Sequence, residues 1–191
     1  IPNSAYNREA QLTEEGFRAG ARVLARMGLS LDAWMYFHQL PELVDFARAV
    51  PDLTIILNHI GGLLRIGPYA DRDEEVLSTW RQGIAAVAQC TNVYVKLGGI
   101  GQPRTGYDWY ARNQPIGSEE LAETMAPYMN YCIEQFGPAR CMFESNFPPD
   151  KVGHSYNVLF NAFKRLSKGY SAAERAAMFH DTAVRAYRIE Y

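Results

Sequence analysis

Short apolar segments alternate with longer segments of helical periodicity along the chain, and this alternation restricts the fold more than any other feature. The predicted strands are Leu31–Phe37, Leu53–Leu57, Asn92–Leu97 and Arg140–Glu144. The predicted helices begin near Thr13, Pro41, Glu74, Ser118, Tyr156 and Ala172. Regular alternation of this kind indicates βα units and parallel strands. The sequence therefore predicts an α/β fold.

The run Leu53–Leu57 is the clearest of these strands, because Pro51–Asp52 precede it and Gly61–Gly62 follow it. Near-continuous apolar strands are typical of parallel sheets that are covered on both faces. Four βα units fit a small open sheet or half of a (β/α)8 barrel, and a whole barrel usually needs about 250 residues. With 191 residues and no linker, the chain is predicted to be a single domain, residues 1–191, too short to close a barrel alone.

Charge and cysteine content argue against several classes of partner. The formal net charge is −2 and the pI is near 6.1, which does not suit a nucleic-acid or anionic-membrane surface. No apolar run approaches the ~18 residues that span a bilayer. Cys90, Cys132 and Cys141 are scattered without metal-type spacing, which favours a reducing compartment. We therefore expect a cytoplasmic protein that binds a small molecule, with no nucleic-acid or membrane partner.

Each predicted strand carries a polar side chain at or near its C-terminal end. These side chains are His38, His59, Lys96, Glu144 and Asn146. Parallel α/β folds place their functional residues at this end of the sheet. Simpler readings stay open: a hydrogen-bonded core histidine, an ion pair between Lys96 and Glu144, or a turn capped by Asn146. We expect these five side chains to converge on one cleft together with Trp34 and Tyr36.

Alternation along a strand sorts its side chains between the two faces of the sheet. The predicted faces group Trp34 with Tyr36 and His38, Ile55 with Leu57 and His59, and Lys96 with Tyr94 and Gly98. In a half-barrel one face lacks its covering layer. We therefore expect Trp34, Tyr36, Ile55 and Leu57 to form much of an exposed apolar patch.

A long polar and aromatic segment, residues 101–117, follows the third strand. A loop of this length in a compact domain is usually functional or disordered. Arg104, near Tyr107, Trp109 and Tyr110, could bind a substrate carboxylate through two hydrogen bonds. The alternative is a solvated loop charge.

Five segments carry a resemblance to a known family. They are HQL at 38–40, PDLTIILNHIGG at 51–62, NVYVKLGG at 92–99, RCMFESNFPPDK at 140–151 and MFHDTAVRAYRI at 178–189. In this order and spacing, the chain resembles the amidohydrolase-related (amidohydrolase 2) family of TIM-barrel, metal-dependent hydrolases over nearly all of its length. The resemblance implies strands five to eight with their helices and a terminal helix. We expect the N-terminal half, with its His-x-His motif, to be absent from this chain.

The resemblance also implies roles for particular residues. His59 matches a histidine that binds a divalent metal or contacts the substrate, and His38 matches a second ligand. Some members use zinc or manganese, and some lactonases need no metal. Many members have Gly-Ser-Asp where this chain has Glu144-Ser145-Asn146. Asn146 cannot be a general base, because an amide has no proton acceptor that titrates near neutral pH. Glu144 or Asp150 would then take that role.

These observations predict a hydrolase that acts on a small carboxylated or lactone substrate. We expect His59 to polarise the carbonyl, Glu144 to activate water and Asn146 to orient it. The predicted substrate-binding residues are Trp34, Tyr36, Lys96 and Arg104. The alternatives are a decarboxylase on the same scaffold and a non-catalytic binding or assembly module.

We expect the chain alone to be inactive and to bind metal weakly, since His38 and His59 fall short of the roughly three protein ligands of a catalytic zinc. Its expected partners are the N-terminal half of the barrel or further copies of itself.

Overall fold

The computed structural model describes residues 11–190, in which four parallel strands form one sheet in the order β1-β2-β3-β4. The strands are β1 Ser30–Ala33, β2 Thr54–Leu57, β3 Val93–Leu97 and β4 Cys141–Phe143. Ala33 pairs with Leu57, and Leu97 pairs with Phe143, so the C-terminal ends of the strands lie at one edge. The predicted α/β class and parallel order are confirmed.

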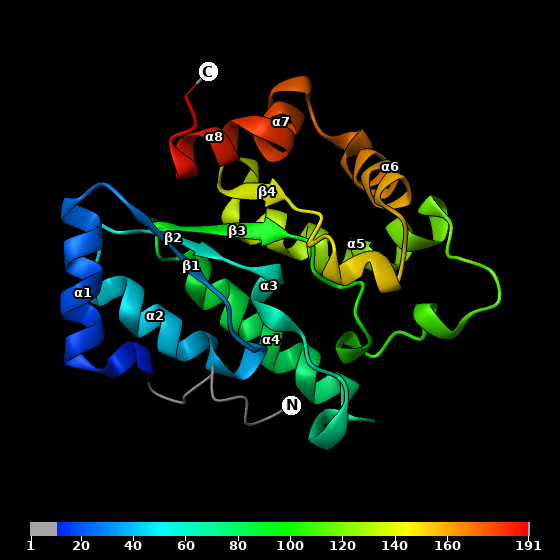
Figure 1. The fold of residues 1–191 in the computed structure, drawn as a ribbon, viewed down its shortest axis with the longest axis horizontal. Helices are drawn as coiled ribbons and strands as arrows, with labels where there is room; N and C mark the ends of the chain where they lie inside the picture. Colours follow the sequence, from blue (N-terminus) through cyan, green and yellow to red (C-terminus); the bar gives the residue numbers. More distant parts are fainter. Residues whose placement is uncertain (1–10, 191) are drawn as a thin grey trace.

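Helices connect the strands and cover the sheet (Figure 1). They are α1 Glu15–Arg26, α2 Leu40–Ala49, α3 His59–Gly62, α4 Asp73–Ala88, α5 Ser118–Phe136, α6 Tyr156–Leu166, α7 Ala172–Ala176 and α8 Thr182–Tyr187. Pro127 lies inside α5, which continues through it. A π-helical turn, Ala177–Asp181, joins α7 to α8. None of the helices within residues 11–190 is both long and apolar enough to cross a membrane.

The first strand is shorter than the predicted range Leu31–Phe37, because its ladder with β2 ends at Ala33. The chain then continues without a partner strand into a 3-10 turn, Phe37–Gln39, which carries His38. Met35 and Phe37 are buried, whereas Trp34 is 38% exposed. The alternation predicted for this segment therefore persists up to the turn, but His38 lies in a turn and not on the strand.

The two faces of the sheet bury different residues. Ile55 and Leu57 are 0% exposed and belong to the main core with α2 and α4, which lie below the sheet in Figure 1. The predicted exposed patch is therefore wrong for Ile55 and Leu57, since alternation points them toward the helices. Ile56 points the other way and packs with Met142 and with Ala186 of α8.

Two partly buried polar side chains join the N-terminal ends of the strands to the helices. The Asn92 amide donates to the carbonyl oxygens of Ala47, Val50 and Leu53. The Arg140 guanidinium donates to four backbone carbonyl oxygens, those of Ala88, Cys90, Val93 and Phe136. Most of these bonds satisfy carbonyl groups at the C-terminal ends of α2, α4 and α5 and in the segments that lead into the strands.

Candidate functional site

His59 and Glu144 form a close pair at the C-terminal edge of the sheet. His59 follows β2 with a φ of 54°, and this backbone conformation turns its ring toward β4. Glu144 Oε1 lies 2.5 Å from His59 Nδ1 and accepts a hydrogen bond of 3.0 Å from the His59 backbone N–H. The two side chains are 13% and 14% exposed. Because one carboxylate oxygen binds both groups, the imidazole orientation is fixed and Nε2 points away from Glu144.

Two glycines after β3 make room for this pair. A Cβ at Gly99 would lie 2.5 Å from the ring of His59, and a Cβ at Gly98 would lie 2.4 Å from the carbonyl oxygen of Glu144. Gly62 has a similar role on the other side, where a Cβ would lie 1.9 Å from the carbonyl oxygen of Met35. Side chains at these positions would displace the neighbouring segments, so the glycines are part of the site.

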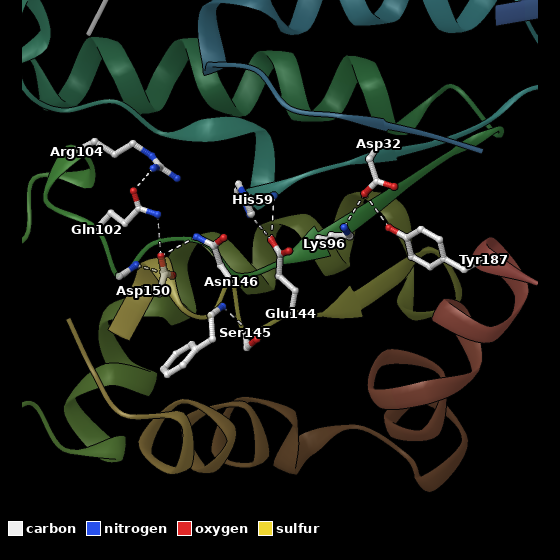
Figure 2. Close-up of polar contacts among 12 residues, drawn as sticks. Asp32, His59, Lys96, Gln102, Arg104, Glu144, Ser145, Asn146, Asp150 and Tyr187 are labelled. Atoms are coloured by element: carbon white, nitrogen blue, oxygen red, sulfur yellow. Dashed lines mark hydrogen bonds and ion pairs between the residues drawn. The ribbon is translucent and has the colours of Figure 1, made fainter. Parts of the chain in front are cut away.

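Asp150 is the centre of a second group of hydrogen bonds (Figure 2). Its Oδ1 accepts from the amides of Asn146 at 2.7 Å and Gln102 at 3.2 Å, and its Oδ2 accepts from the backbone N–H of Gly101 at 2.9 Å. Asp150 is only 1% exposed. A general base has to reach the proton that it removes. Asp150 therefore fits a structural role that joins the β4 loop to the segment after β3.

Arg104 extends this hydrogen-bonded group toward the aromatic side chains after β1. Its Nη1 donates to Gln102 Oε1, and its guanidinium carbon lies 5.8 Å from the centre of the Trp34 ring. Its Nε is buried and has no hydrogen-bond partner among residues 11–190. Burial lowers the pKa of Arg104, while the charges of Asp150, Tyr36 and Glu144 act in the opposite direction. Arg104 is therefore a partly buried cation facing the site and not a solvated loop charge.

Trp34, Tyr36 and His38 form a row of rings beside Arg104. Trp34 and Tyr36 pack edge to face at 5.1 Å, and Tyr36 stacks on His38 at 6.1 Å. The His38 ring also stacks on Tyr69, whose hydroxyl lies 3.5 Å from His38 Nδ1. Within residues 11–190, no group of three or more His, Cys, Asp or Glu side chains could hold a metal ion. The metal roles of His38 and His59 stay predictions.

The ion-pair partner of Lys96 differs from the one considered in the sequence analysis. Lys96 Nζ lies 2.6 Å from Asp32 Oδ1, the same oxygen that accepts a hydrogen bond of 2.8 Å from the Tyr187 hydroxyl of α8. The alternative ion pair between Lys96 and Glu144 is therefore wrong. Burial lowers the pKa of Lys96, but hydrogen bonds to Asp32 and Tyr187 outweigh burial and leave the pKa raised. Figure 2 shows Lys96 with its contact to Asp32, and a substrate role for Lys96 stays a prediction.

The geometry adds residues that sequence reasoning did not include in the site. Gln102 links Asp150 to Arg104. Asn58, which precedes His59, has a buried Oδ1 that lacks a hydrogen-bond partner in the described part of the chain. The position of Asn58 at a strand end was the available signal. Nothing local marked Gln102, because its partner Asp150 is 48 residues away in the chain.

Comparison with known proteins shows to which family the chain belongs. The family model described as Amidohydrolase matches residues 2–189. The chain belongs to the amidohydrolase family. This amidohydrolase is 38% identical to the protein y4mH of Sinorhizobium fredii over 91% of the chain and 52% of that protein. It is 26% identical to an L-fucono-1,5-lactonase of Burkholderia multivorans over 94% of the chain and 58% of the enzyme. The chain thus spans between half and three fifths of these relatives.

A solved relative supports the predicted fold. The crystal structure of a zinc-bound amidohydrolase from Burkholderia multivorans is similar with a TM-score of 0.81 and 25% identity, over 95% of this chain and 60% of that one. The four parallel strands match the C-terminal half of a TIM barrel, which confirms the fold predicted for this amidohydrolase.

The donor atoms of the site can be compared with the needs of a metal. A catalytic zinc usually has about three protein ligands. His59 Nδ1 is bound to Glu144, so the pair leaves His59 Nε2 and the second carboxylate oxygen. These two donors do not make a complete set, and residues 11–190 do not fit a catalytic metal by themselves.

Proposed function

We propose that the protein is a lactonase-type hydrolase in which water attacks the carbonyl of a small carboxylated or lactone substrate. The observation that carries this proposal is the pair of His59 and Glu144, joined at 2.5 Å and placed at the C-terminal edge of a parallel sheet. The kinship with a lactonase supports the reaction class.

His59 is the proposed general base. When Glu144 is ionised, it accepts a hydrogen bond from Nδ1–H of His59, so the proton stays on Nδ1 and Nε2 carries the lone pair that can take a proton from water. Glu144 would then orient the ring and stabilise the imidazolium that forms. This assignment moves the activation of water from Glu144, where the sequence placed it, to His59, because Oε1 of Glu144 is already bonded to His59. Asn146, held by Asp150 through its Nδ2, keeps its Oδ1 to orient the water.

Arg104 is the proposed anchor for the substrate carboxylate. Its partly buried guanidinium has an unpartnered Nε and lies over Trp34, beside the row formed with Tyr36. A guanidinium in such surroundings binds carboxylates more strongly than one in water. Trp34 and Tyr36 would contact the ring of the substrate.

A divalent metal and further chain segments are part of the proposal. Zinc or manganese, if bound, would polarise the scissile carbonyl, and its remaining ligands would lie outside residues 11–190. The edge strands β1 and β4 have no second neighbour, which favours pairing with the N-terminal half of a barrel or with another copy of the chain. Three buried, free thiols are consistent with a cytoplasmic location.

The test is hydrolysis of a panel of sugar-acid lactones by the whole protein, followed by proton release. His59→Asn should lower kcat/KM by about 10²- to 10⁴-fold, the usual contribution of a general base. Failure of the wild type to open any lactone, or full activity of His59→Asn, would contradict the proposal. Release of CO2 from a carboxylated substrate would instead support the decarboxylase.

A further inference from the structure

A second concave region lies between residues 109–115 and residues 147–156. It is a cleft of about 620 Å³, within the range of about 300–1,000 Å³ that small-molecule sites occupy. His59, Glu144 and Arg104 do not line it. The cleft is therefore separate from the candidate catalytic site.

Aromatic side chains form the walls of this cleft. Tyr110 is 59% exposed and Tyr156 is 51% exposed, whereas Trp109 behind them is 4% exposed. Phe147 packs edge to face on Tyr156 at 5.4 Å. Exposed tyrosines around a concave surface provide rigid faces on which a planar ring can pack.

His154 lines the cleft and lacks a hydrogen-bond partner. It is 4% exposed, and both ring nitrogens are buried without a partner among residues 11–190. The ring lies between Trp109 at 6.2 Å and Phe147 at 6.0 Å. Burial lowers its pKa despite the nearby charge of Asp150. A neutral imidazole has one donor and one acceptor, and buried groups of this kind are normally satisfied.

The cleft also has a cation at its edge. Lys151 is exposed and forms no ion pair within the part of the chain that the structure describes. Arg112, the other cation of the lining, is paired with Glu120 at 2.5 Å and with Asp108 at 3.4 Å. Lys151 is therefore the cation that can pair with an incoming carboxylate.

We propose that this cleft is a binding site for a small phenolic carboxylate. The ring packs between Tyr110 and Tyr156, the carboxylate pairs with Lys151, and the hydroxyl reaches His154 at the inner wall. The site is distinct from the His59 site and does not depend on the lactonase proposal.

The inner wall adjoins the hydrogen bonds of Asp150. A Cβ at Gly101 would lie 2.7 Å from His154 Nε2 and 2.9 Å from Asp150 Cβ. The Gly101 backbone N–H donates to Asp150 at 2.9 Å. The inner wall of the cleft is therefore adjacent to the segment that carries Gln102 and Arg104.

The test is calorimetric titration of the whole protein with 4-hydroxyphenylacetate, phenylacetate and 4-hydroxyphenylacetamide. The proposal predicts saturable binding of the first probe and about fivefold weaker binding without the hydroxyl or without the charge. Lys151→Met should weaken binding of the carboxylate probes about threefold to fivefold and leave binding of the amide probe unchanged. Lys168→Met, a change of another exposed lysine, should leave all three affinities unchanged.

Two further measurements locate the bound probe. Tyr110→Ala should weaken binding, and the ring resonances of His154 should shift on saturation, while His59→Asn should bind the probe normally. Absence of saturable binding, equal affinities of Lys151→Met and Lys168→Met, or loss of binding in His59→Asn would overturn the proposal.

Discussion

Gly99 lies directly against the ring of His59: a Cβ at this position would stand 2.5 Å from His59 Cγ and 2.6 Å from Nδ1. Both residues have positive φ angles, 75° for Gly99 and 54° for His59. The turn after β2 and the turn after β3 therefore fit together only when one of them lacks a side chain.

Gly99→Ala should disrupt the site more than an ordinary glycine substitution. Gly28 has a similar φ of 68° with nothing within 4 Å of its Cβ position. Gly28→Ala therefore measures backbone strain alone, a loss of about 1 kcal/mol in the free energy of unfolding. Gly99→Ala adds the clash with His59 and should lose more stability and most of the proposed lactonase activity. Urea unfolding and kcat/KM check this. Equal losses for the two variants would show that the contact does not matter.

Glu144→Gln should keep the fold and lower the activity. The amide retains an oxygen for the His59 backbone N–H but cannot stabilise an imidazolium as a carboxylate does. We expect kcat/KM to fall about 10- to 100-fold, the usual range for partners that orient a functional histidine. Glu123→Gln, on the exposed face of α5, is the matched control and should retain wild-type kinetics.

Much of the fold could be predicted from local patterns. Strand β2, which ends before Asn58, and helix α1, which ends before Gly28, are specified by residues close in sequence. Both lie near their predicted positions. Ser171 and Glu174 form a capping box at the start of α7, which is a pattern of residues close in sequence. The end of β1 could not be predicted, because it depends on where β2 stops pairing.

The site was predictable only in part. The strand-end rule identified His59 and Glu144, which lie 85 residues apart and are in contact. Alternation failed after Leu57, since positive φ angles at His59 and Ile60 interrupt the extended backbone. The contacts of Asp150 with Gly101 and of Lys96 with Asp32 join distant segments, 49 and 64 residues apart. No local pattern encodes them.

Lys96 should make stability sensitive to alkaline pH. Its folded pKa is raised above 10.5, so its contribution is complete below pH 10.5 and is lost as the pH rises through the folded pKa. Lys96→Met should therefore flatten the decline of the unfolding free energy above about pH 10.5 relative to the wild type. Parallel declines in both proteins, measured by urea unfolding, would contradict this role.

His154 should make stability sensitive to acid pH. Its folded pKa is lowered from 6.5 by burial, so its contribution is present above pH 6.5 and is lost as the pH falls through the folded pKa. The unfolding free energy should decline below pH 6.5, and His154→Gln should decline less steeply. An unchanged slope in the variant would show that His154 is not the group responsible.

The 191-residue chain alone should hold metal weakly. His59 and Glu144 leave two free donors between them, fewer than the roughly three that a catalytic zinc takes from protein. Elemental analysis after dialysis against a chelator should find well under one zinc or manganese per chain. One tightly held metal per chain would mean that the described residues contain a ligand set that the geometry does not reveal.

His59 and Glu144 are proposed to act as one unit in hydrolysis. The most direct measurement is a double-mutant cycle on kcat/KM for lactone hydrolysis by the whole protein, with His59→Asn, Glu144→Gln and both changes together. If Glu144 works only through His59, the double variant should be no slower than His59→Asn alone. If the two losses multiply, Glu144 acts independently of His59 and the account is contradicted.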